Sequence, residues 1–196
     1  MRREPKRGNK LPPLRKLIHI STLLVPILTE LTSKTVVLSA LCVIAIAYAL
    51  GEVSRLKGRR VPLLTPFTLR MSRPDERDRF IIRPLYLAVG VILTLLLFPT
   101  YIAYASIAIL ALGDPVAAYV GGRFGRNHVR RRKTLEGLVA GFVAAFLVAA
   151  LIVSPLAALV GSIGGMLMEL LDTPDDNLTM PIAAGALMTL LSLAAH

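Results

Sequence analysis

The sequence is poor in cysteine and in acidic residues, and each shortage excludes a class of protein. Its single cysteine, Cys42, lies inside an apolar run, so neither a disulfide framework nor a cysteine metal site is available. Only 12 Asp and Glu stand against 23 Lys and Arg, which gives a formal net charge of +11. In a soluble protein this charge would suggest nucleic acid, but a membrane surface also explains it, and we expect no nucleic-acid partner.

Apolar residues, by contrast, are abundant. They make up 55% of the 196 residues, and the mean hydropathy of +0.66 exceeds that of ordinary soluble domains. One bilayer crossing needs roughly 20 residues, so the length suits about seven short crossings and leaves no room for a second domain. We therefore expect a single integral membrane domain over residues 1–196, without a cleaved signal sequence.

The apolar residues form separate segments that predict an all-α, polytopic membrane helix bundle. Several segments are shorter than a full crossing, which predicts tilt or local thinning of the bilayer. The predicted crossings lie at residues 17–31, 35–50, 84–98, 101–120, 135–153, 155–171 and 180–195.

The basic residues predict the orientation of this bundle. Residues 1–16, 55–83 and 121–133 hold 22 of the 23 Lys and Arg, and Lys34 is the exception. Basic residues accumulate in loops that stay in the cytoplasm. We therefore expect a cytoplasmic N-terminus with a basic tail over residues 1–14, an external C-terminus, and all long polar segments on the cytoplasmic face.

The first chemical signal is an acidic interruption of the fourth apolar segment by Gly113-Asp114-Pro115. A carboxylate at membrane depth needs a partner or a metal, and the alternative is a structural pair with an arginine of a neighbouring helix. The glycines that follow would let backbone N–H groups approach a phosphate, as would the start of the next helix beside Lys133. The residues concerned are Gly121, Gly122, Arg123 and Gly125, then Lys133, Thr134, Glu136 and Gly137. For the arginines at 130–132 a plain membrane anchor is the alternative.

A second signal is an acidic cluster after the sixth segment, formed by Glu169, Asp172, Asp175 and Asp176 next to Asn177. Magnesium binds through one or two carboxylates together with substrate phosphates, and it would offset the repulsion in such a cluster. The alternative is that these residues cap the last helix, with Asn177 as the N-cap, and pair with nearby arginines.

Two further groups are expected on the same face. Arg15, Lys16 and His19 share one side of a helix, and His19 is either functional or an ordinary interfacial residue. Glu52 and Arg55, three residues apart, either pair with each other or hold the substrates. The proline-broken loop 61–70 is expected to lie along the interface or to be a mere connector.

Taken in order, these motifs resemble the polyprenol kinase family, which contains dolichol kinases, phytol kinases and CTP-dependent diacylglycerol kinases. The blocks are Arg-Lys-x-x-His, Glu-x-x-Arg, Gly-Asp followed by Gly-x-x-Phe-Gly, Lys-Thr-x-Glu-Gly and Asp-Asp-Asn-Leu-x-x-Pro, between Arg15 and Pro181. The arginine-rich stretch 126–132 departs from the pattern, and it would alter how the protein binds phosphates or anionic lipids. The resemblance implies transfer of a phosphoryl group from CTP, with ATP as the alternative donor, to a lipid alcohol with the help of Mg²⁺.

The resemblance also implies roles for these residues. The implied catalytic residues are Asp114, Lys133, Glu136 and Asp176; the implied metal ligands are Asp114, Asp175 and Asp176. The implied nucleotide-binding residues are Gly113, Gly121, Gly122, Arg123, Gly125, Lys133, Thr134, Gly137 and Asn177. The other candidate site residues are Arg15, Lys16, His19, Glu52, Arg55 and Glu169.

Two other functions fit the same composition. A cytidylyltransferase that makes a CDP-lipid would also need magnesium, a phosphate site and a membrane-borne acceptor. A small transporter would carry charges near the midplane and internal repeats, whereas we find no repeat and expect the charges at the ends of the crossings. The sequence decides neither the lipid alcohol nor the oligomeric state.

Overall fold

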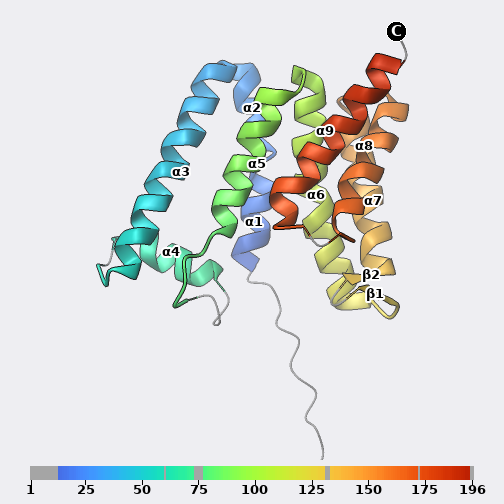
Figure 1. Ribbon diagram of the computed structural model, residues 1–196. Helices are drawn as coiled ribbons and strands as arrows, with labels where there is room; N and C mark the ends of the chain where they lie inside the picture. Colours follow the sequence, from blue (N-terminus) through green and yellow to red (C-terminus); the bar gives the residue numbers. More distant parts are fainter. Residues whose placement is uncertain (1–12, 60, 73–76, 131–132, 172, 195–196) are drawn as a thin grey trace, which may run out of the picture.

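In the computed structural model, most of the chain folds into helices that pack side by side as a bundle (Figure 1). The structure describes residues 13–59, 61–72, 77–130, 133–171 and 173–194. The elements are α1 (Pro13–Ser21), α2 (Leu24–Leu31), α3 (Lys34–Leu56), α4 (Leu64–Met71), α5 (Arg83–Leu97), α6 (Thr100–Phe124), β1 (His128–Arg130), β2 (Lys133–Thr134), α7 (Leu135–Ala150), α8 (Pro155–Met168) and α9 (Asp176–Ala194). The helical fold class is confirmed, and the antiparallel hairpin β1–β2 is an addition that the all-α prediction missed.

Three helices, α3, α6 and α9, are long and apolar enough to cross a membrane, and α5, α7 and α8 are shorter apolar helices. The chain runs back and forth along the bundle, so that the hairpin and the start of α1 lie at one end and the C-terminus lies at the other (Figure 1). Large apolar side chains also cover the outside of the bundle, as at Val43 and Leu50 of α3, each 65% exposed. Such a surface suits membrane association.

Helix α6 forms the centre of the bundle, where it contacts α1, α5, α7, α8 and α9. Small and branched side chains allow this close packing: Ala103, Ile107 and Leu110 are completely buried. The helix continues through Asp114 and Pro115 to Phe124. The prediction that Gly113-Asp114-Pro115 interrupts the helix, and that it ends near residue 120, is therefore wrong. Pro115 removes one backbone donor, and the surrounding helices hold the rest of α6 together.

The first apolar segment, predicted as one crossing over residues 17–31, is divided into α1 and α2. Pro26 explains the break, because its ring would clash with the carbonyl of Thr22 and it has no N–H to donate there. The Thr22 carbonyl instead accepts from Val25 N at 3.0 Å, a tighter turn than an α-helix makes.

Other boundaries also differ from the prediction. Helix α8 ends at Met168 and α9 begins at Asp176, so the acidic segment between them covers residues 169–175 and not the predicted 172–179, and it lies recessed from the end of the bundle that carries the hairpin (Figure 1). The loop predicted at residues 61–70 contains α4, which lies across the ends of other helices.

Candidate functional site

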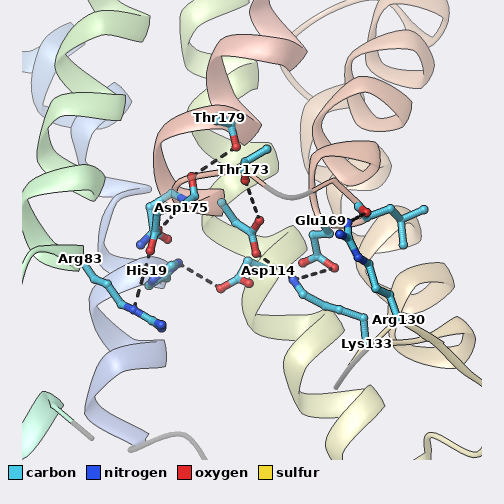
Figure 2. A network of polar contacts seen from close by, with 12 residues as sticks. His19, Arg83, Asp114, Arg130, Lys133, Glu169, Thr173, Asp175 and Thr179 are labelled. Atoms are coloured by element: carbon cyan, nitrogen blue, oxygen red, sulfur yellow. Dashed lines mark hydrogen bonds and ion pairs between the residues drawn. The ribbon is translucent and has the colours of Figure 1, made fainter. Parts of the chain in front are cut away.

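A cluster of charged side chains lies inside the bundle, centred on Lys133 of β2 (Figure 2). The Lys133 Nζ lies 2.8 Å from Asp176 Oδ2 and 3.5 Å from Glu169 Oε2. Asp176 is the first residue of α9, and Glu169 directly follows the last residue of α8. Thr134, next to Lys133, caps α7 by accepting from Gly137 N, which fixes the strand that carries the lysine. The lysine segment and the acidic segment, predicted to share a pocket, thus meet.

Asp114 of α6 and His19 of α1 form the adjoining side of the cluster. Asp114 Oδ2 lies 3.4 Å from His19 Nδ1, and the histidine is buried. Asp114 precedes the end of α6 at Phe124 by ten residues, which is a distance of about 15 Å along the helix. Asp114 therefore lies well inside α6 and not at its end.

Burial and charge act in opposite directions on Lys133. Burial alone lowers its pKa, but the carboxylates of Glu169, Asp176 and Asp114 outweigh this effect and raise the pKa above its ordinary value. The lysine is therefore a fixed positive charge surrounded by acids.

Glu169 is the most buried acid of the cluster, at 4% exposure, and its Oε1 has no hydrogen-bond partner among the residues that the structure describes. Burial raises the pKa of this carboxyl to about 8, against the opposing effect of Lys133. An acceptor oxygen without a donor, facing a cluster of acids, suits a cation or a phosphate-bound metal that is not part of the chain.

Asp175 has a different environment from its neighbour Asp176. Its Oδ1 accepts from Asn177 N at 3.1 Å, and its Oδ2 lies 3.8 Å from Arg83 Nε at the start of α5. Asp175 therefore caps α9, and the prediction that Asn177 is the N-cap is wrong, because the helix already begins at Asp176. Asn177 is buried in the first turn, and its carbonyl packs against Gly90 of α5.

Sequence reasoning assigned no site role to three residues of this network. Arg83 pairs with Asp175, Thr173 Oγ1 donates to Asp176 Oδ1 at 3.5 Å, and Arg130 donates to the carbonyl of Leu170 (Figure 2). For Arg130 the sequence left a role in phosphate binding or a plain membrane anchor open, and its bond to the segment after α8 was not predicted. Nothing near Arg83 in the sequence identifies its partner, because the contact depends on how α5 packs on α9.

The predicted phosphate-binding glycines lie at positions where helices approach closely. A Cβ on Gly137 would lie 2.6 Å from the carbonyl oxygen of Ala117, and one on Gly121 would lie 2.7 Å from Thr134 Oγ1. Gly113 and Gly125 are similarly crowded, by Met166 and by Gly121 with Thr134, whereas a Cβ on Gly122 meets nothing within 4 Å. Close packing therefore explains Gly113, Gly121, Gly125 and Gly137, whereas it does not explain Gly122.

Several predicted site residues lie away from the cluster. Arg123 is exposed, with its guanidinium 5.6 Å from the centre of the Phe124 ring. Glu136 accepts from Asn127 Nδ2 at 2.9 Å and from its backbone N at 3.1 Å, so it ties the hairpin to α7. Lys16 lies over the ring of Tyr119, 5.0 Å from its centre. The side chain of Arg15 and the whole of Asp172 lie outside the described residues.

Glu52 and Arg55 form a separate group at the end of α3. Arg55 Nη2 donates to Glu52 Oε1 at 2.7 Å, and Ile81 N donates to the same carboxylate at 2.8 Å. Arg55 also donates to the carbonyls of Arg77 and Arg79. The structure therefore favours the pairing alternative, in which the two side chains hold residues 77–81 against α3.

The cluster offers the oxygen ligands that magnesium prefers, but its described residues do not form a complete coordination sphere. Within the part of the chain that the structure describes, no three His, Cys, Asp or Glu side chains come together as a metal site. Magnesium does not require such a cage, because it usually binds through one or two carboxylates together with phosphate oxygens and water. Asp176 and Glu169 supply two carboxylates around Lys133, with Asp114 near enough to act on both charges.

Comparison of the chain with models of protein families, with curated proteins and with solved structures finds no match in any of the three.

Proposed function

We propose that the chain is a membrane lipid-alcohol kinase that transfers the terminal phosphate of a nucleoside triphosphate, CTP in preference to ATP, to an isoprenoid alcohol such as dolichol, phytol or geranylgeraniol. The observation that carries the proposal is the meeting of Lys133 with Asp176 and Glu169 beside Asp114, inside an apolar bundle. In this proposal the helices cross the bilayer about seven times, with α1 and α2 together as the first crossing, and the N-terminus is cytoplasmic.

Phosphoryl transfer needs little more than positioning and charge neutralisation, because its transition state is loose. Lys133 would donate to phosphate oxygens, and the acidic side chains would hold the metal. A bound magnesium ion would neutralise part of the phosphate charge, with Asp176, Glu169 and Asp114 as its available ligands. The hydroxyl oxygen of the lipid forms a bond to the terminal phosphorus, the bond from that phosphorus to the bridging oxygen breaks, and the nucleoside diphosphate leaves. The hydroxyl proton passes to a carboxylate of the cluster.

The depth of the cluster supports a lipid acceptor. Asp114 lies about 15 Å from the end of α6, with apolar residues on either side of it along the helix. A lipid alcohol would enter sideways with its chain between the helices and its hydroxyl at the cluster, whereas a water-soluble alcohol would gain no apolar contact from these surroundings. His19 of α1 borders the same position.

The test uses the full chain reconstituted in vesicles with dolichol, phytol, geranylgeraniol and diacylglycerol. CTP and ATP are each supplied with the label at the γ or at the α phosphate. We expect γ label in an isoprenoid alcohol, with CTP the better donor. Label from the α phosphate would instead identify a cytidylyltransferase, and absence of label from every lipid would contradict both enzymes.

A further inference from the structure

Helix α4 (Leu64–Met71) buries two polar residues and exposes apolar ones, which is the reverse of a surface helix in a water-soluble protein. Thr65 and Thr68 are buried, at 8% and 1% exposure, whereas Leu63 and Phe67 are 88% and 43% exposed. Pro66 and Arg70 are also exposed. Leu63, Pro66, Phe67 and Arg70 are spaced by three, four and seven residues and so share one face of the helix, here named the α4 outer face. In water this arrangement would leave apolar surface exposed that could have been buried.

The contacts within the chain hold α4 in this orientation. Leu64 packs so closely on α3 that a Cβ on Gly51 would lie 1.8 Å from Leu64 Cδ2. The hydroxyl of Thr65 accepts from Val61 N at 3.0 Å and closes the start of the helix. Helix α4 also contacts α1. The packing of Leu64 on α3 and the bond at Thr65 therefore fix the orientation of α4.

Leu63 adds a second observation. Its φ of 65° and ψ of −47° are those of a γ-turn, a strained conformation for a leucine, and the hydrogen bond that Leu64 N donates to the Pro62 carbonyl at 2.8 Å closes this turn. The side chain nevertheless points outward and is 88% exposed, so no packing within the described chain compensates for this strain. Strained residues of this kind cluster at functional sites, where the surrounding structure holds them in place.

The surroundings of the α4 outer face indicate what covers it. Helix α4 lies across the end of the bundle near the start of α1, not along the bundle axis (Figure 1). Among the described residues from 57 to 72, the charged side chains are Lys57, Arg59 and Arg70, which are all basic and exposed. A helix that combines an apolar outer face with basic residues fits the boundary between anionic headgroups and acyl chains.

We propose that α4 is an interfacial anchor that binds the surface of an anionic bilayer. Leu63 and Phe67 lie about 5 to 10 Å into the headgroup and acyl boundary, and Lys57, Arg59 and Arg70 contact lipid phosphates. The inference rests on the membrane placement in the proposed function and not on its phosphoryl chemistry. Since α4 contacts α1, which carries His19, the anchor sets the depth of the charged cluster relative to the bilayer surface.

The absence of tryptophan from the chain gives a direct test. Three full-length variants each introduce one tryptophan: Phe67→Trp in α4, Ile44→Trp on the exposed side of α3, and Val129→Trp in the hairpin. Each variant is reconstituted in vesicles whose lipids carry bromine either near the headgroup or near the end of the acyl chain. Neutral and anionic vesicles are compared, and Arg70→Glu is added to the Phe67→Trp variant, with Lys34→Glu as the matched control at the other end of the bundle.

We expect the Phe67→Trp variant to be quenched mainly by bromine near the headgroup, the Ile44→Trp variant by bromine near the chain end, and the Val129→Trp variant by neither. Quenching of the Phe67→Trp variant falls in neutral vesicles and with Arg70→Glu, and Lys34→Glu leaves it unchanged. A Phe67→Trp variant that resists both quenchers, while the Ile44→Trp variant is quenched, would overturn the anchor and leave the kinase proposal standing.

Other outcomes would also overturn the anchor. Equal quenching in neutral and anionic vesicles would contradict the binding of anionic lipids, and quenching as deep as that of the Ile44→Trp variant would place α4 in the hydrocarbon. Emission that follows protein concentration and not lipid would assign the α4 outer face to a second copy of the chain. Failure of the Ile44→Trp variant to be quenched at all would remove the membrane placement itself.

Discussion

The ammonium group of Lys133 donates a hydrogen bond to the carboxylate of Asp176 across 2.8 Å, although 43 residues separate the two in the chain. The contact joins the strand before α7 to the first turn of α9, and Glu169 and Asp114 complete its surroundings. The segment that carries Lys133 and the segment that carries Glu169 and Asp176 therefore form one charged cluster.

Replacing Lys133 by methionine should lower the rate of phosphoryl transfer about 100-fold or more, because one positioned donor for a developing charge contributes that much. The measurement is the initial rate of γ-label transfer from CTP to the lipid. Lys34→Met is the matched control, since Lys34 begins α3 at the far end of the bundle. A Lys133→Met variant that folds and keeps its full rate would contradict the assigned role.

The adjacent acids Asp175 and Asp176 should respond differently to substitution by alanine. Asp175→Ala removes the cap of α9 and should lower the free energy of unfolding by about 1 kcal/mol. Asp176→Ala should abolish transfer, and it should remove the rise in melting temperature that magnesium with CTP produces in the unaltered protein. Thermal unfolding with and without magnesium and CTP measures both effects. Equal loss of activity in the two variants, with no difference in melting, would show that they share one role.

Much of this cluster could be predicted from the sequence because charge is rare in an apolar chain. Asp114 and Glu169 stand out against apolar neighbours, Lys133 and Asp176 lie in short charged runs, and the structure brings all four together. The pairing of Arg83 with Asp175 could not be foreseen, since it depends on how α5 crosses α9 at Gly90 and not on any local pattern.

The helices were predictable to the extent that hydropathy determines them. Hydropathy located each long helix, but it could not show that Pro26 divides the first segment while Pro115 leaves α6 continuous. The difference lies in tertiary packing, because α6 is enclosed by other helices and the first segment is not. The burial of polar residues in α4 could not be predicted either, because nothing in the sequence marks Thr65 and Thr68 as the buried side of the helix.

Alanine substitutions at glycines of α6 and α7 should distinguish a packing role from a role in phosphate binding. Gly137→Ala places a Cβ 2.6 Å from the carbonyl oxygen of Ala117, and overpacking of this kind costs typically about 1 to 3 kcal/mol. Gly122 lies in α6, where an added Cβ meets nothing within 4 Å, so Gly122→Ala should stabilise the protein by about 0.5 to 1 kcal/mol. Unfolding of the two variants in mixed micelles measures this difference. Loss of nucleotide binding in a stable Gly122→Ala variant would instead restore the phosphate-binding role of these glycines.

The buried carboxyl of Glu169 should make stability depend on pH in a defined direction. Its pKa is raised from 4.5 to about 8, chiefly by burial. Below the lower value the group is protonated in both the folded and the unfolded chain, so it adds no pH dependence. Between the two values only the folded chain retains the proton, and its contribution to the free energy of unfolding therefore falls as pH rises, until both states are ionised above the upper value. Lys133 stays charged throughout this window, because its own pKa is raised. Melting curves of the unaltered protein and of Glu169→Gln, measured from pH 5 to 9, should diverge through this range, with the variant showing the flatter dependence. Because the other titrating groups are common to both proteins, parallel curves would mean that Glu169 is ionised in the folded chain and is compensated by Lys133 alone.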